Sequence, residues 1–173
     1  GTDGTDTLSN IETLRFADQN FDITPSGQNV EGDSSDNTLE GDVADDYIYG
    51  YGGNDILKGL GGDDEIYGGE GDDTIEGGNG DDIIRGEDDD DNLSGGDGDD
   101  TIYGGEGDDT LDGGSGSNII YGEDGNDIFA ATNGTLYGNA GDDQFNLSGD
   151  VNAYGGEGND SFTSSSFVAS GYI

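Results

Sequence analysis

A nine-residue period governs this chain from Gly32 to Ala130, where eleven units follow one another without a break. Most units read G-G-x-G-x-D-x-U-x, in which U is a large apolar residue, and Gly68–Glu76 matches without substitution. A short, fixed period indicates one small structural unit stacked many times. Because each unit carries an acidic residue at the same place, stacking arranges these carboxylates in files, and a cation must neutralise them.

Each unit divides into six turn residues and three strand residues, such as Thr74-Ile75-Glu76. Side chains alternate along a strand, so the middle residue points inward and its flanks point outward. We predict an all-β fold, a right-handed parallel β-roll (β-solenoid) with two short-stranded parallel sheets, in which two units make one turn. The predicted inward residues are all aliphatic or aromatic: Leu39, Ile48, Leu57, Ile66, Ile75, Ile84, Leu93, Ile102, Leu111, Ile120 and Phe129, then Leu136, Phe145, Ala153 and Phe162.

The composition does not provide an ordinary core. Only 28% of the residues are hydrophobic, and 42 acidic residues face three basic ones, for a net charge of −39. Composition alone is typical of a disordered chain, so we expect order to depend on a ligand. The chain has no Cys and no His, which excludes disulfides and imidazole metal ligands. Its charge disfavours nucleic acid and anionic membranes, and no stretch is apolar enough to span a bilayer.

The period changes along the chain and predicts four segments. Gly1–Ser9 already fits the nonapeptide, so we expect the chain to begin inside a repeat array. The apolar residues of 10–31 predict two short strands that cap the first coil of the array. The segments are 1–31, the end of a preceding repeat plus a capping insert; 32–130, eleven tandem nonapeptides; 131–163, a modified roll of alternating short and full units; and 164–173, a terminal strand or frayed end.

Two files of acidic residues follow from the stacking, one on each edge of the roll. The first file runs Asp55, Asp73, Asp91, Asp109, Asp127, Asp143 and Asp160. The second file runs Asp46, Asp64, Asp82 and Asp100, and Asn118 follows it. The second edge then gives way to tight turns at Asn133-Gly134 and Gly149-Asp150. We therefore predict that one edge keeps its metal sites to the end of the roll while the other loses them.

The files favour calcium. Equivalent carboxylates lie about 4.8 Å apart in a parallel stack, and two such charges repel by about 3.5 kcal/mol at an effective dielectric near 20. Carboxylates and free carbonyls of Gly-rich turns are hard oxygen donors, which suit Ca²⁺ better than Mg²⁺ or zinc. Counting neighbouring pairs gives up to eleven Ca²⁺ if Asn37 and Asn118 take part, and these would cancel 22 of the 39 net negative charges.

The tandem G-G-x-G-x-D-x-U-x units resemble the RTX (repeats-in-toxin) family of hemolysin-type calcium-binding repeats, over residues 1–9 and 32–163. The resemblance implies a ligand set in which carbonyls of the second and fourth residues and the Asp of one unit join carbonyls of the first and third residues and the Asp two units on. Besides the two Asp files, the glycines implied are Gly53, Gly62, Gly69, Gly71, Gly78, Gly80, Gly86, Gly96, Gly98, Gly104, Gly105, Gly107 and Gly125.

Some units depart from this pattern. Asn37 and Asn118 stand in place of Asp, which predicts weaker sites there. Ala44 and Asp89 replace the fourth glycine, where a positive φ is needed. The turn that ends at Asp91 is therefore the most doubtful of the array. The alternative, that the files are merely solvated acidic turns, does not explain the nine-residue register.

The resemblance also implies a setting. RTX modules leave Gram-negative bacteria through type I secretion and fold in extracellular calcium, so we expect a secreted or cell-surface bacterial protein, such as an adhesin, toxin, matrix or filament component. The alternative is the accessory module of a type I-secreted protease, lipase or alginate epimerase-like enzyme. The module itself is not expected to be an enzyme, because it lacks a His-based triad, H-E-x-x-H, G-x-S-x-G and a P-loop.

A row of tyrosines occupies the last strand place of alternate units, with Arg85 in the one rung that lacks Tyr. Two interpretations stay open for this outward face. The stacked rings stabilise their own sheet, or they form a docking face for self-association, another protein or a polysaccharide. The row consists of Tyr49, Tyr67, Tyr103, Tyr121, Tyr137 and Tyr154.

Overall fold

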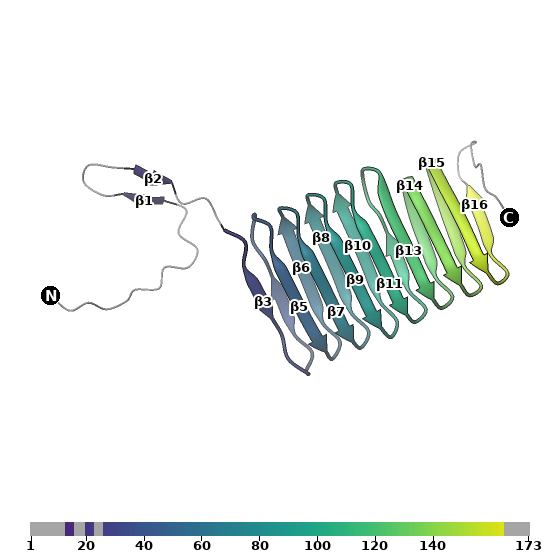
Figure 1. The fold of residues 1–173 in the computed structure, drawn as a ribbon, viewed down its shortest axis with the longest axis horizontal. Helices are drawn as coiled ribbons and strands as arrows, with labels where there is room; N and C mark the ends of the chain where they lie inside the picture. Colours follow the sequence, from purple (N-terminus) through teal and green to yellow (C-terminus); the bar gives the residue numbers. More distant parts are fainter. Residues whose placement is uncertain (1–12, 16–19, 23–25, 165–173) are drawn as a thin grey trace.

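The computed structural model describes residues 13–15, 20–22 and 26–164, and all regular structure within them is β-strand. Figure 1 shows a flat coil in which successive strands lie side by side along one axis. Within these residues no helix is long and apolar enough to cross a membrane. The strands of the coil are β3 (Asn29–Glu31), β4 (Thr38–Glu40), β5 (Tyr47–Gly52), β6 (Ile56–Gly61), β7 (Glu65–Glu70), β8 (Thr74–Asn79), β9 (Ile83–Asp88), β10 (Asn92–Asp97), β11 (Thr101–Glu106), β12 (Thr110–Asp112), β13 (Asn118–Asp124), β14 (Ile128–Ala140), β15 (Gln144–Glu157) and β16 (Ser161–Ser164).

The strand pairing confirms the predicted parallel roll. Odd-numbered strands from β3 to β13 pair with each other, even-numbered strands from β4 to β12 do the same, and every pair within the roll is parallel. The long strand β14 pairs with both β12 and β13 and so joins the two layers. Ile48 pairs with Ile66, which is 18 residues further on, so two nonapeptides make one turn. The fold is a parallel β-solenoid of about eight turns.

The core consists of the inward side chains that the period predicts, with one file of side chains from each layer. The predicted residues from Ile48 to Phe129 are fully buried, as are Leu136 and Phe145. At the two ends of the stack, Leu39 and Phe162 are only partly buried and pack against this core. The inward aromatic rings stack along the axis, with centroids 4.5 Å apart for Phe129 and Phe145. Each rung thus adds one apolar contact to the rung before it.

The C-terminal coils are shortened on one edge, as predicted. Tyr121 pairs with Tyr137, 16 residues on, instead of the 18 found earlier in the roll. The chain rounds this edge at Gly134 and Gly149, whose φ angles are 116° and 98°, while strands β14 and β15 continue through it. Three apolar side chains that the sequence analysis did not place inward are buried in the same region: Ala131, Leu147 and Val151. Apolar packing therefore accompanies the loss of the second acidic file.

The N-terminal insert contains the two short strands predicted there. β1 (Thr13–Arg15) and β2 (Asn20–Asp22) pair antiparallel in a sheet of their own. Their capping role stays a prediction. The roll itself begins at β3, which pairs in parallel with β5, one strand before the first full nonapeptide. The predicted first repeat, residues 1–9, and most of the terminal segment, residues 165–173, lie outside the described residues.

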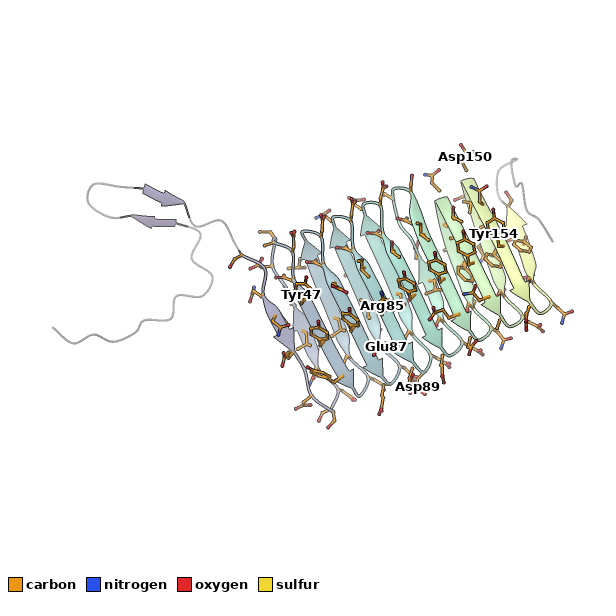
Figure 2. All side chains as sticks on the ribbon, viewed as in Figure 1. Tyr47, Arg85, Glu87, Asp89, Asp150 and Tyr154 are labelled. Atoms are coloured by element: carbon orange, nitrogen blue, oxygen red, sulfur yellow. The ribbon has the colours of Figure 1, made fainter. Side chains whose placement is uncertain are left out.

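The tyrosine row forms a stacked ladder on the outer face of one layer, and Figure 2 labels Arg85 and the last tyrosine of the row, Tyr154. Arg85 fills the missing rung, with its guanidinium 4.2 Å from the Tyr103 ring centroid and 5.9 Å from that of Tyr67. Such contacts stabilise adjacent strands. The ring centroids lie 4.9 to 5.2 Å apart in the pairs Tyr49–Tyr67, Tyr103–Tyr121, Tyr121–Tyr137 and Tyr137–Tyr154.

Adjacent isoleucines on β9 test the assignment of the core. Ile84 is fully buried, whereas Ile83 is 37% exposed on the outer face. We expect Ile84→Ala to lower the free energy of unfolding in millimolar calcium by about 2–5 kcal/mol, because it leaves a cavity in a thin core. The matched control, Ile83→Ala, should change it by about 0.5 kcal/mol or less. Equal effects in a denaturant titration would contradict the burial pattern.

Candidate metal centre

The acidic files are held in place by the sheet register. The backbone N–H of one Asp donates to Oδ1 of the Asp in the next coil, at 2.8 Å from Asp73 to Asp91 and 3.0 Å from Asp82 to Asp100. The pattern crosses the shortened coils of the first edge, where Asp127 N–H donates to Asp143 Oδ1 at 2.9 Å. Each bond orients a carboxylate inside its turn. The structure therefore brings the predicted Asp residues together in two continuous files.

The second oxygen of these carboxylates is left without a partner. Nine Oδ2 atoms are buried and accept no hydrogen bond within the described residues. A buried polar atom without a partner costs free energy, and a buried charge costs far more, so native proteins seldom leave one unexplained. The nine atoms belong to Asp55, Asp64, Asp73, Asp82, Asp91, Asp100, Asp109, Asp127 and Asp143.

A backbone carbonyl from the next coil faces each of these orphaned oxygens. The site beside Gly68 is representative, because a Cβ built there would overlap Asp73 Oδ2 and lie 2.7 Å from the Gly86 carbonyl oxygen. Both oxygens are acceptors and no donor is placed between them, so a cation bound there would satisfy both at once. Glycine at the first place of the unit keeps a side chain out of this position. The Gly104 and Gly122 carbonyls approach the next sites of the same edge in the same way.

The other glycines predicted as ligands shape the turns. All of those at the second and fourth places of their units have a positive φ, from 96° at Gly53 to 149° at Gly98, in the region that favours glycine. Gly86 and Gly104 occupy first places and do not have positive φ. These two are the only first-place glycines among the predicted ligands. Seven other first-place glycines also lie beside an orphaned Oδ2 atom, and the first G of the full units is the sequence signal for them: Gly50, Gly59, Gly68, Gly77, Gly95, Gly122 and Gly138.

Burial makes these carboxylates hard to ionise in the absence of a cation. It is the largest cause that raises the pKa of Asp91 to about 8, and the neighbouring charges of Asp109 and Asp73 contribute to the same increase. Burial is also the largest cause that raises the pKa values of Asp82 and Asp127 to about 7. The N–H donated by the previous coil lowers each pKa but does not offset burial. Desolvation also raises the pKa to about 6 in Asp64, Asp73, Asp100 and Asp109.

The donor set fits calcium. Among the described residues, no three acidic side chains converge on one point. A site between two coils thus offers at most two carboxylates, and main-chain carbonyls must complete it. A shell of carboxylate and carbonyl oxygens is typical of Ca²⁺, which accepts six to eight such ligands in flexible geometry.

Four predicted positions at the ends of the files differ from the rest. Asp160 is only partly buried. Asp46 is buried, but its Oδ2 accepts the N–H of Asp42 at 2.6 Å. Asn37 Oδ1 accepts the N–H of Asp33 at 2.7 Å. Asn118 is buried, and its Nδ2 donates to the Gly113 carbonyl at 2.6 Å.

The doubtful turn before Asp91 keeps the common geometry. Glu87 and Asp89 stand where glycine is expected, and they adopt φ angles of 85° and 76°. A positive φ is uncommon for a residue with a Cβ. Asp91 Oδ2 is nevertheless buried and orphaned like its neighbours. The stack therefore imposes the turn conformation even without glycine.

Comparison with known proteins points to one family. The sequence model described as the RTX calcium-binding nonapeptide repeat (4 copies) matches residues 31–66, 58–93, 67–102, 85–120, 94–129, 103–144, 133–153 and 147–166. A search of the curated proteins found no match.

The raised pKa values predict that acid favours the wound form without metal. The pKa of Asp91 is near its ordinary value of 3.8 in the unfolded chain and is raised to about 8 by burial, so the wound form binds more protons between these limits. Stability therefore rises as pH falls through this range. In chelator, we expect the β-sheet signal in circular dichroism to grow as the pH is lowered from about 8 to about 5. A metal-free chain that is most ordered at the alkaline end would contradict this.

The requirement for glycine at the first place of the unit can be tested by substitution. We expect Gly86→Ala to lower the free energy of unfolding in millimolar calcium by about 1–3 kcal/mol, because the new methyl meets Asp91 Oδ2 and the Gly104 carbonyl. The control is Gly61→Ala, where the nearest atom to a new Cβ is 3.6 Å away and φ is not positive. Thermal unfolding at several calcium concentrations measures both. The interpretation fails if Gly61→Ala is as damaging as Gly86→Ala.

Proposed function

Because the chain belongs to the RTX family of calcium-binding nonapeptide repeats, we propose that it is a module that folds as it binds Ca²⁺ along the two edges of its roll. The observation that supports this most directly is the set of nine buried, orphaned Oδ2 atoms. The proposed ligands are the carboxylates of the two Asp files together with the carbonyls of the Gly-rich turns. The site beside Gly68, with Asp73 Oδ2 and the Gly86 carbonyl, is the clearest example.

The proposed mechanism is linkage between binding and folding. The unfolded chain does not hold the carboxylates one strand spacing apart, so calcium favours the wound form and folding follows its concentration. Bound calcium would supply positive charge between like-charged oxygens. Extracellular calcium modules bind at roughly 10⁻⁴–10⁻³ M. At cytosolic concentrations the chain would stay open, and outside the cell it would close.

We further propose that the module belongs to a larger secreted or cell-surface bacterial protein, exported by type I secretion. Support comes from the family and from the expectation that a chain kept open by low calcium stays competent for passage through a channel. An adhesin, toxin, matrix or filament component is the first choice. The alternative is the accessory module of a type I-secreted enzyme. RTX repeats are a structural, generally non-catalytic module, and we propose no catalysis for this one.

The tyrosine ladder is proposed to stiffen the roll. Its rings stack with planes 8° to 11° apart, so each ring covers the face of the next. A partner chain, a second roll or a polysaccharide would therefore meet mainly ring edges and hydroxyl groups. Docking on this face stays a prediction.

Circular dichroism in millimolar Ca²⁺, in millimolar Mg²⁺ and in chelator tests the proposed function. We expect β-sheet signal at neutral pH with Ca²⁺ and a disordered spectrum in chelator, because the carboxylate files repel without a divalent cation. Mg²⁺ should be much less effective, since it dehydrates reluctantly and requires an octahedral site. A chain that is equally folded in chelator would rule the mechanism out.

A further inference from the structure

The first coil of the roll has turns of unusual sequence on both edges. In the turns 32–37 and 41–46, neither the second nor the fourth residue is glycine. The second place is Asp in both cases, Asp33 and Asp42. No residue at these second or fourth places has a positive φ, unlike the corresponding residues of the following turns. The first coil therefore forms its turns with a different backbone conformation.

A side-chain hydrogen bond explains this conformation. Asp33 Oδ1 accepts the N–H of Ser35 at 2.9 Å, and Asp42 Oδ1 accepts the N–H of Ala44 at the same distance. These are Asx-turns, in which the Asp side chain accepts the backbone N–H of the residue two positions later. Both turns share the motif although they lie on opposite edges and differ in their other residues.

In both of these turns, the altered backbone points an N–H donor at the position where the repeat predicts a cation. The N–H of Asp33 points at Asn37 Oδ1 at 2.7 Å, and the N–H of Asp42 points at Asp46 Oδ2 at 2.6 Å. The atom that is satisfied at Asp46 is the one left orphaned in nine later carboxylates. A Cβ at Gly41 would overlap that oxygen and lie 2.8 Å from the Gly59 carbonyl, which is the cation position of the later coils.

The turn 86–91 shows that loss of glycine does not by itself produce this change. It also lacks glycine at the second and fourth places, yet Glu87 and Asp89 adopt positive φ and Asp91 Oδ2 stays orphaned. The direction of the second-place N–H therefore separates the two kinds of turn.

We propose that the two turns of the first coil close without metal, because the backbone N–H of Asp33 and of Asp42 takes the place of the cation. The inference rests on the proposed function and deepens it. Of eleven positions that the repeat predicts, the roll then fills nine, one for each orphaned oxygen. The ion files begin at the second coil, and the first coil is a metal-independent end of the roll.

Asn118 applies the same chemistry at the far end of the second file. Its Nδ2 lies beside Gly113, where other units place the carboxylate Oδ2, and donates to the Gly113 carbonyl. An amide N–H donor therefore stands where other units place the carboxylate oxygen that would bind a cation. The second file therefore ends with the site at Asp100, whose Oδ2 is orphaned.

Calcium stoichiometry tests the proposal, measured by equilibrium dialysis of the full chain with excess Mg²⁺ to occupy exposed carboxylates. We expect nine Ca²⁺ per chain, matching the nine orphaned oxygens. The double substitution Asp42→Gly with Ala44→Gly restores the repeat pattern in turn 41–46 and should add one ion. The matched control, Glu87→Gly with Asp89→Gly, makes the same change in a turn that already has an orphaned oxygen and should add none.

The outcomes separate this proposal from the function on which it rests. Eleven ions in the unmodified chain, or an extra ion in the control variant alone, would overturn the metal-free first coil while leaving calcium-driven folding intact. An unchanged count in the Asp42→Gly, Ala44→Gly variant, with circular dichroism showing it folded, would also overturn it. If the unmodified chain takes up no calcium, the proposed function itself fails.

Discussion

Repulsion between like charges stacked in register is the constraint on which this structure depends. Parallel strands pair residue over equivalent residue, so an Asp in the turn of one coil lies over the Asp of the next. The hydrogen bond that fixes each carboxylate, such as Asp73 N–H to Asp91 Oδ1, satisfies one oxygen and leaves the other facing a carbonyl. The same register that builds the sheets therefore creates a series of oxygen pairs with no hydrogen-bond donor from the described residues between them.

The roll closes its edges in two different ways. Where the acidic files run, glycines keep the turn open and a cation is needed between oxygens. On the shortened edge after Asn118, the buried side chains of Ala131, Leu147 and Val151 accompany the turn instead. Apolar burial there contributes stability that does not depend on calcium. The two edges of the C-terminal coils should therefore respond differently to calcium, although they belong to the same rungs.

The period predicted most of the fold because a strict repeat leaves little freedom. Once nine residues make half a turn, the inward place of Ile84 and the file position of Asp91 follow, and both are confirmed as buried. Burial of Leu147 and Val151 was not predicted, because the short units break the period on which the register was counted. The hydrogen bond from the Asp42 N–H to Asp46 Oδ2 was also not predicted. It depends on a local Asx-turn, which the repeat pattern does not contain.

Position in the stack explains why similar sequences form different turns. The turn 86–91 lies between coils on both sides, and their hydrogen bonds hold Glu87 and Asp89 at positive φ despite the local cost. The turn 32–37 is the first full turn on its edge, so fewer neighbouring bonds oppose the preference of Asp33 for an Asx-turn. Cooperation between coils thus imposes the metal-binding conformation in the interior, while local side-chain chemistry decides the conformation at the end. An end coil that satisfies its own oxygens does not require the cation that the interior coils need.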